Sequence, residues 1–84
     1  MGNGDIKIET KYAMDNLKYT IEAAGGTMDD IVKVNVYIKD IKMMKDFNEV
    51  YPTYFKKQLP ARIAMQIVDL AGGANLEIDA VAVI

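Results

Sequence analysis

Two residue types that often perform chemistry at neutral pH are missing from this chain of 84 residues, which has neither histidine nor cysteine. Without histidine, the commonest general base and the commonest metal ligand are absent. Without cysteine, a disulfide framework and a thiolate nucleophile are excluded. Any catalysis must therefore use carboxylates, tyrosine, lysine, arginine, backbone amides and water.

Long apolar runs and clustered charges are also missing. No stretch is apolar enough to span a membrane, and the start lacks a signal-peptide pattern, so we expect a soluble, cytoplasmic protein. Acids and bases are interspersed to a net charge of -2. Nucleic acid is not expected as a partner, because binding through phosphates needs a basic stripe. The length predicts a single domain, residues 1–84.

A first amphipathic helix is predicted near the start of the chain. Asp5 is its N-cap, an apolar stripe runs from Ile6 to Ala24, and two glycines then end it with a left-handed cap. Three apolar or aromatic residues lie off this stripe: Ile8, Tyr12 and Tyr19. The sequence leaves two interpretations open for them, ordinary exposed side chains or a subunit contact.

A second helix is predicted from an N-cap at Asp40 to about Lys57. Pro52 lies inside it and predicts a kink, because proline removes one helical hydrogen bond and crowds the preceding turn. The apolar stripe of this helix consists of Met43, Phe47, Val50, Tyr51, Tyr54 and Phe55.

Alternation with a period of two predicts three strands, at Ile31–Lys39, in the segment after Pro60 and at Leu76–Ile84. Two helices can cover only one face of such a sheet, so the order helix, strand, helix, strand, strand predicts an α+β fold. The strand residues expected to face the helices are Val32, Val34, Val36 and Ile38, then Ile63, Met65 and Ile67, and finally Leu76, Ile78, Ala80, Ala82 and Ile84.

The opposite face of the sheet would be polar and would hold the candidate functional residues. Arg62, the only arginine of the chain, is expected there with Glu77 and Asp79. The planar fork of an arginine matches a carboxylate or a phosphate. Two interpretations stay open: Arg62 forms a structural ion pair with one of the acids, or it holds a substrate carboxylate while an acid handles a water or a proton. The two acids are too few for a metal site.

Three motifs carry a family resemblance: Pro60-Ala61-Arg62 before a strand, Glu77-Ile78-Asp79-Ala80 in the last strand, and Asn48-Glu49-Val50-Tyr51 in the second helix. Their order and spacing resemble the Rid family, the YjgF-type imine and enamine deaminases that are also known as L-PSP endoribonucleases. The resemblance implies a chorismate-mutase-like α+β fold with both helices on one face of the sheet. It also implies a homotrimer with active sites between subunits.

The resemblance further implies the hydrolysis of 2-aminoacrylate or 2-iminopropanoate to a 2-oxo acid and ammonia, without metal or cofactor. In the family pattern, Arg62 matches the arginine that holds the substrate carboxylate. Glu77 matches the acid that positions or activates the hydrolytic water, and Asn48 matches a recurrent asparagine near the substrate.

One part of the family pattern has no counterpart in these 84 residues. Rid proteins start with a hairpin that carries a site tyrosine and a serine-glycine stretch, so this chain is expected to be short at its N-terminus. An alternative is therefore a non-catalytic, trimeric member that binds small 2-imino or 2-oxo acids, and whether the chain is an enzyme stays open. The family's ribonuclease and translation-inhibitor labels imply a third activity, but the acidic balance and the lack of histidine count against it.

Overall fold

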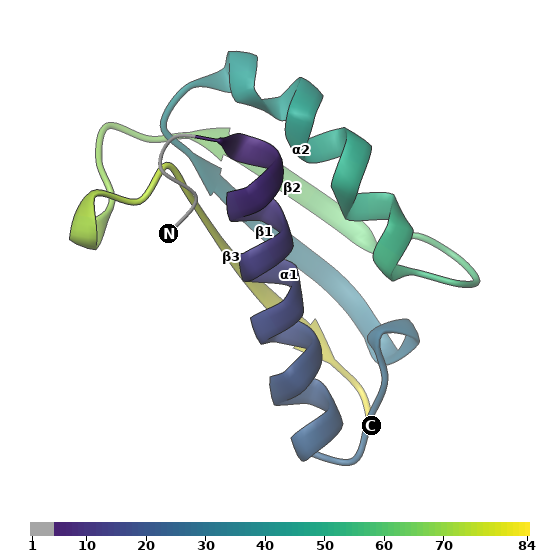
Figure 1. Cartoon of the computed structure of the whole chain (residues 1–84). Coiled ribbons are helices and arrows are strands. Elements are labelled where there is room, and N and C mark those ends of the chain that lie inside the picture. Colours follow the sequence, from purple (N-terminus) through teal and green to yellow (C-terminus); the bar gives the residue numbers. More distant parts are fainter. Residues whose placement is uncertain (1–4) are drawn as a thin grey trace.

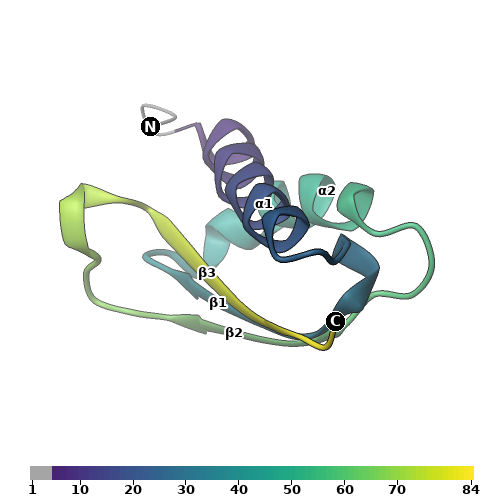
Figure 2. The same ribbon diagram turned by 90° about the horizontal axis from the view of Figure 1, so that it is seen from below.

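The computed structural model of the chain describes residues 5–84, so the first four residues of the predicted domain lie outside it. The helices and strands follow the predicted order, and both helices lie on the same face of the sheet (Figures 1 and 2). The α+β prediction is therefore confirmed. The elements are helix α1 (Ile6–Ala23), strand β1 (Ile31–Ile38), helix α2 (Met44–Val50), strand β2 (Ala61–Gln66) and strand β3 (Leu76–Ala82).

Strand β1 is the centre of the sheet, whose order is β2-β1-β3. It pairs in parallel with β2 and antiparallel with β3. The parallel pair needs a crossover connection, and α2 lies on that connection. Strands β2 and β3 are thus both edge strands within the described residues. Neither helix in this part of the chain is long and apolar enough to cross a membrane.

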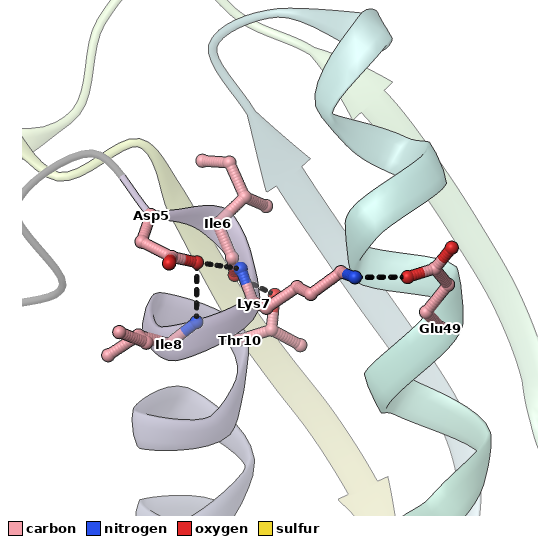
Figure 3. A network of polar contacts seen from close by, with 6 residues as sticks. All are labelled: Asp5, Ile6, Lys7, Ile8, Thr10 and Glu49. Carbon is pink, nitrogen blue, oxygen red and sulfur yellow. Dashed lines mark hydrogen bonds and ion pairs between the residues drawn. The ribbon is translucent and has the colours of Figure 1, made fainter.

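Helix α1 begins and ends as the sequence predicts. The Asp5 carboxylate accepts hydrogen bonds from the backbone N–H groups of Lys7 and Ile8, at 3.0 and 3.2 Å (Figure 3). At the other end, the Gly26 N–H donates to the carbonyl oxygen of Ile21 at 3.0 Å. Gly25 has a φ of 91°, a backbone conformation that favours glycine and closes the helix with a left-handed cap.

The second helical segment is shorter than predicted. It opens with a 3-10 turn (Ile41–Met43) after Asp40, continues as α2, and ends with a second 3-10 turn (Tyr51–Tyr54). The predicted end at about Lys57 is therefore wrong by three residues. The α-helix ends at Val50 and the 3-10 turn begins at Tyr51, next to Pro52, which has no N–H to continue the α-helical pattern.

The hydrophobic core lies between the two helices and the sheet. Its centre is built from the helix stripes and from the middle of β1, because β1 is covered by strands on both sides and by helices above. The buried apolar residues are Ile6, Met14, Ile21, Met28, Ile31, Val34, Val36, Ile38, Phe47, Tyr51 and Leu76.

Two face assignments in the outer parts of the sheet need correction. Val32 is exposed and Ile31 is buried in its place, because the pairing register of β1 shifts between Ile31 and Lys33. The last strand alternates as predicted but ends at Ala82, and Ile84 is exposed.

The larger correction concerns β2, whose two faces are the reverse of the prediction. Ile63 and Met65 are 47% and 41% exposed. Arg62 pairs with Val34 and Ala64 pairs with Val36, two residues that are fully buried beneath the helices. Residues paired across a ladder point to the same side. Arg62, Ala64 and Gln66 therefore face the helices, and Ile63 and Met65 lie on the open face.

Edge position explains how a polar set can occupy the helix side of β2. The helices cover the rim of the sheet incompletely, so polar side chains there reach solvent or backbone partners. Gln66 uses this position to accept a hydrogen bond from the backbone N–H of Ile41 at 2.8 Å. Arg62 uses it to reach α2, as described next.

Candidate substrate-binding site

Arg62 lies at the start of β2 and reaches toward α2 rather than into the open face of the sheet. Its Nη1 donates a hydrogen bond of 2.8 Å to Oδ1 of Asn48. The guanidinium carbon lies 5.7 Å from the ring centre of Phe47 and 5.2 Å from that of Tyr51. The structure thus brings together Arg62 and Asn48, two residues that the sequence singled out for substrate binding.

The two aromatic rings beneath Arg62 form a stack at the end of α2. Phe47 and Tyr51 are one helical turn apart, and their ring centres lie 5.2 Å from each other. Burial raises the pKa of the Tyr51 hydroxyl, whereas the nearby Arg62 charge opposes that shift. The hydroxyl is buried and has no hydrogen-bond partner among residues 5–84. The stack therefore presents ring faces, not a hydroxyl, to the guanidinium.

A surface pocket of about 340 Å³ opens beside this arrangement. Its polar end holds Arg62 and Asn48, and its remaining wall is mainly apolar because two prolines and a leucine contribute to it. Such a pocket suits a small anion with an attached hydrocarbon group. The residues that line it are Asn48, Tyr51, Pro52, Leu59, Pro60 and Arg62.

A larger groove of about 560 Å³ lies between α1 and the turns Met28–Asp30 and Tyr51–Tyr54. Lys11, Lys18 and Lys56 line it together with Glu22 and Asp29, so its positive charge is largely balanced. It contains none of the residues predicted to bind substrate. The smaller pocket is the better candidate because its single cation is a guanidinium with free donors.

Glu77, the third predicted site residue, lies on the open face of the sheet and pairs in register with Tyr37. Since Arg62 faces the helices, the structure does not bring Glu77 and Arg62 together within one chain. Asp79 is engaged on the open face too, where it accepts hydrogen bonds from Asn35 at 2.7 Å and from the Tyr37 hydroxyl at 3.1 Å. The bond to Asp79 raises the pKa of Tyr37.

Within one chain, the structure therefore contradicts the interpretation of Arg62 as half of an ion pair with Glu77 or Asp79. Within residues 5–84, Arg62 forms no ion pair, and its one side-chain hydrogen bond goes to Asn48. The same residues contain no group of three carboxylates that could hold a metal ion.

Sequence reasoning placed Phe47 and Tyr51 in the apolar stripe of the second helix but missed their contact with Arg62. The sequence did contain one signal for this contact: Phe47 and Tyr51 are four positions apart, and the candidate residue Asn48 lies between them. That spacing places two rings on one helix face. The sequence did not show that the face of β2 with Arg62 points toward the helices.

Comparisons with a family model, with related sequences and with solved structures all identify similar proteins. Residues 1–84 match the family model described as endoribonuclease L-PSP. The chain is 42% identical over 79 residues to a RutC family protein of Pyrococcus horikoshii. The aligned region covers 94% of this chain and 63% of that protein. It is 41% identical over 80 residues to the 2-iminobutanoate/2-iminopropanoate deaminase of Rattus norvegicus, with 95% and 58% covered.

A solved structure agrees with these sequence relatives. E. coli TdcF with bound serine superposes with a TM-score of 0.91 and 32% identity, covering 95% of this chain and 65% of that one. The chain thus spans about three fifths of the length of the curated relatives it matches.

Proposed function

Because this chain belongs to the endoribonuclease L-PSP family, the Rid family that its motifs resemble, we propose that it hydrolyses reactive 2-imino acids to 2-oxo acids and ammonia. The observation that carries the proposal is the Arg62 guanidinium, which has free donors beside a small, mainly apolar pocket. A relative at 41% identity is named as a deaminase of two such substrates. Another relative binds serine, an amino acid with a free carboxylate.

In the proposed mechanism, the substrate carboxylate forms a charge-assisted hydrogen-bonded pair with Arg62. An enamine such as 2-aminoacrylate first tautomerises to 2-iminopropanoate. Water then adds across the C=N bond, and the resulting carbinolamine expels ammonia to leave pyruvate. A carboxylate can accept the proton of the attacking water. Glu77 is the residue proposed for that role, and Asn48 holds Arg62 in place through its amide oxygen.

Such a site requires a second copy of the chain, since Arg62 and Glu77 lie on opposite faces of one sheet. The open face offers a surface for such a contact, because the exposed Ile63, Met65 and Val81 lie among its polar residues. Exposed apolar groups of this kind often mark interfaces. We therefore propose that Arg62 and Asn48 of one copy and Glu77 of another complete the site in a homotrimer.

The test is the release of 2-oxo acid from freshly generated 2-aminoacrylate. The wild-type protein is expected to accelerate release over the uncatalysed rate. Arg62→Ala should lower kcat/KM by roughly 10- to 100-fold, the range expected for hydrogen bonds to a charged group. Tyr19→Phe, an exposed change on α1 away from the pocket, should behave as wild type. Folded wild-type protein without acceleration, or a fully active Arg62→Ala variant, would overturn the proposal.

A second candidate function is the binding of 2-oxo acids without turnover. It is favoured by the separation of Arg62 from Glu77 within one chain, which leaves the anion site without an acid. Calorimetric titration with pyruvate distinguishes the two candidates. Binding that depends on Arg62, in protein that does not accelerate deamination, would establish the binding function instead.

A further inference from the structure

The Arg62 guanidinium sits at the apex of a triangle whose other corners are two aromatic ring centres. The distances from its central carbon are 5.7 Å to Phe47 and 5.2 Å to Tyr51, and the two rings are 5.2 Å apart. Both distances lie within the range in which a cation is attracted to a ring face. The contact is therefore made with both rings at once.

The two rings are fixed by the core. Phe47 is fully buried and Tyr51 is 2% exposed. A third ring, Phe55, packs against Tyr51 in a tilted arrangement, with 5.0 Å between the ring centres. Buried, close-packed side chains keep single rotamers. The surface on which Arg62 rests is therefore rigid, although Arg62 itself is exposed at an edge strand.

The remaining contact of Arg62 fixes its rotation over the rings. Nη1 donates to Asn48, the residue next to Phe47 on α2. A guanidinium carries five N–H donors. One of them serves Asn48, and none of the others has a partner among residues 5–84, so they remain for a ligand in the pocket that Arg62 lines.

We propose that Phe47 and Tyr51 are positioning residues, whose stacked rings hold the Arg62 guanidinium in place before the substrate carboxylate arrives. An exposed arginine loses rotamer freedom when it binds a ligand, and a side chain that is already held loses less. The inference rests on the proposed role of Arg62 in carboxylate binding. It also accounts for an arginine here in a chain otherwise served by lysines, since a planar guanidinium stacks on rings and a compact ammonium does not.

The first test needs no substitution, because Arg62 is the only arginine and its Nε–H signal in a nitrogen-15 NMR spectrum is unambiguous. We expect an order parameter close to the backbone value of about 0.85 in the ligand-free protein. A value below about 0.6, typical of a mobile side chain, would overturn the proposal.

One variant and its control extend the test to the Phe47 ring. Phe47→Leu removes that ring and should lower the Nε–H order parameter. Tyr19→Leu removes an exposed ring of α1 that does not line the pocket, so it should match wild type. Backbone amide signals of β1 report whether each variant is folded. A folded Phe47→Leu protein with an unchanged order parameter would contradict the role of its ring.

The functional readout is carboxylate affinity. Phe47→Leu should raise the Kd for pyruvate by about 3- to 10-fold, the range that corresponds to a cation–π contact. In turnover assays it should raise KM while leaving kcat unchanged, a split that general destabilisation would not produce. Tyr19→Leu should change neither value. An unchanged Kd in folded Phe47→Leu protein would overturn the proposal.

Failure of the proposed function gives a different pattern. If wild-type protein binds pyruvate with an ordered Arg62, and Phe47→Leu weakens that binding, the positioning role stands even when no 2-aminoacrylate is hydrolysed. If hydrolysis occurs while Arg62 is mobile and Phe47→Leu is fully active, the deaminase function stands and the positioning role fails.

Discussion

At the scale of single residues, the Asn48 amide determines how the Arg62 guanidinium is turned. Asn48 is exposed, and its Oδ1 accepts the one hydrogen bond that Arg62 makes within the described residues. We expect Asn48→Ala to raise the Kd for pyruvate by about 3- to 10-fold, since a charge-assisted hydrogen bond that orients the receptor is lost. The melting temperature should change little because no buried group is removed.

Asn16→Ala provides the matched control for this prediction. It is the same substitution at an exposed position of α1, far along the chain from the pocket, and among residues 5–84 the Asn16 side chain forms no hydrogen bond. Equal pyruvate affinity in the two variants would contradict the orienting role of Asn48. Calorimetry measures both affinities under the same conditions.

The sequence could identify Arg62 and Asn48 as candidates but could not show their contact. Arg62 stands out because it is the only arginine, and Asn48 because it lies in a family motif. Their contact depends on which face of β2 points toward α2. Phe47 and Tyr51 escaped notice as site residues because a buried aromatic in a helix stripe is ordinarily core.

At the scale of elements, the polar contacts of two side chains, Tyr54 and Lys7, hold the helical segments together. The Tyr54 hydroxyl, on the 3-10 turn after α2, donates to Oδ1 of Asp15 on α1 at 2.7 Å. Burial, and then the bond to Asp15, raise the pKa of Tyr54, so the hydroxyl remains a donor at neutral pH. Tyr54→Phe should lower the free energy of unfolding by about 1–2 kcal/mol.

Tyr19→Phe is the control for Tyr54→Phe, because Tyr19 is exposed and its hydroxyl makes no hydrogen bond in the described structure. Urea unfolding followed by circular dichroism measures both variants. If Tyr54→Phe and Tyr19→Phe unfold at the same midpoint, the Tyr54 contact does not stabilise the packing of the two segments.

The second contact is an ion pair between Lys7 of α1 and Glu49 of α2, with 2.6 Å between Nζ and Oε2 (Figure 3). The hydrogen bond to Lys7 lowers the pKa of Glu49 from its ordinary value of 4.5. Its stabilisation is therefore present above pH 4.5 and lost as the pH falls through the lowered folded-state pKa. The pKa of Lys7 is raised from 10.5, so the same stabilisation is lost again as the pH rises above that value.

Glu49→Gln provides the test of this pH dependence. Thermal unfolding should show a lower melting temperature than wild type at pH 7, by a small amount because both side chains are exposed. The difference should vanish below the folded-state pKa of Glu49. A difference that stays constant from pH 7 to pH 3 would show that the ion pair is not its cause.

Alternation along the strands predicted their positions well but predicted one face wrongly. A period of two says which residues share a face and does not say which face is buried. In β1 and β3 the apolar set faces the helices and is buried or half-buried, apart from the ends and the register shift near Val32. In the edge strand β2, the more apolar set, which includes Ile63 and Met65, lies on the open face. Which face of β2 is covered therefore depends on the position of the helices and not on which set of residues is more apolar.

At the scale of the whole molecule, the two faces of the sheet hold different sets of residues. The covered face holds the core and, at its rim, the Arg62 pocket. The open face lies on the side of the sheet away from both helices (Figure 2). It holds Glu77 among polar and exposed apolar residues. A deaminase site that uses both Arg62 and Glu77 must therefore join the covered face of one copy to the open face of another. Such a contact uses two different surfaces, and three copies related by rotation can close it into a ring.

Complementation between two variants tests this account most directly. In the release of pyruvate from 2-aminoacrylate, Arg62→Ala is expected to keep roughly 1–10% of wild-type activity, and Glu77→Gln is expected to be nearly inactive. When the two are refolded together in equal amounts, we expect about one quarter of wild-type activity, because random assembly joins an intact Arg62 to an intact Glu77 at one contact in four. A mixture no more active than the separate variants, beside an active wild type, would contradict a site shared between copies.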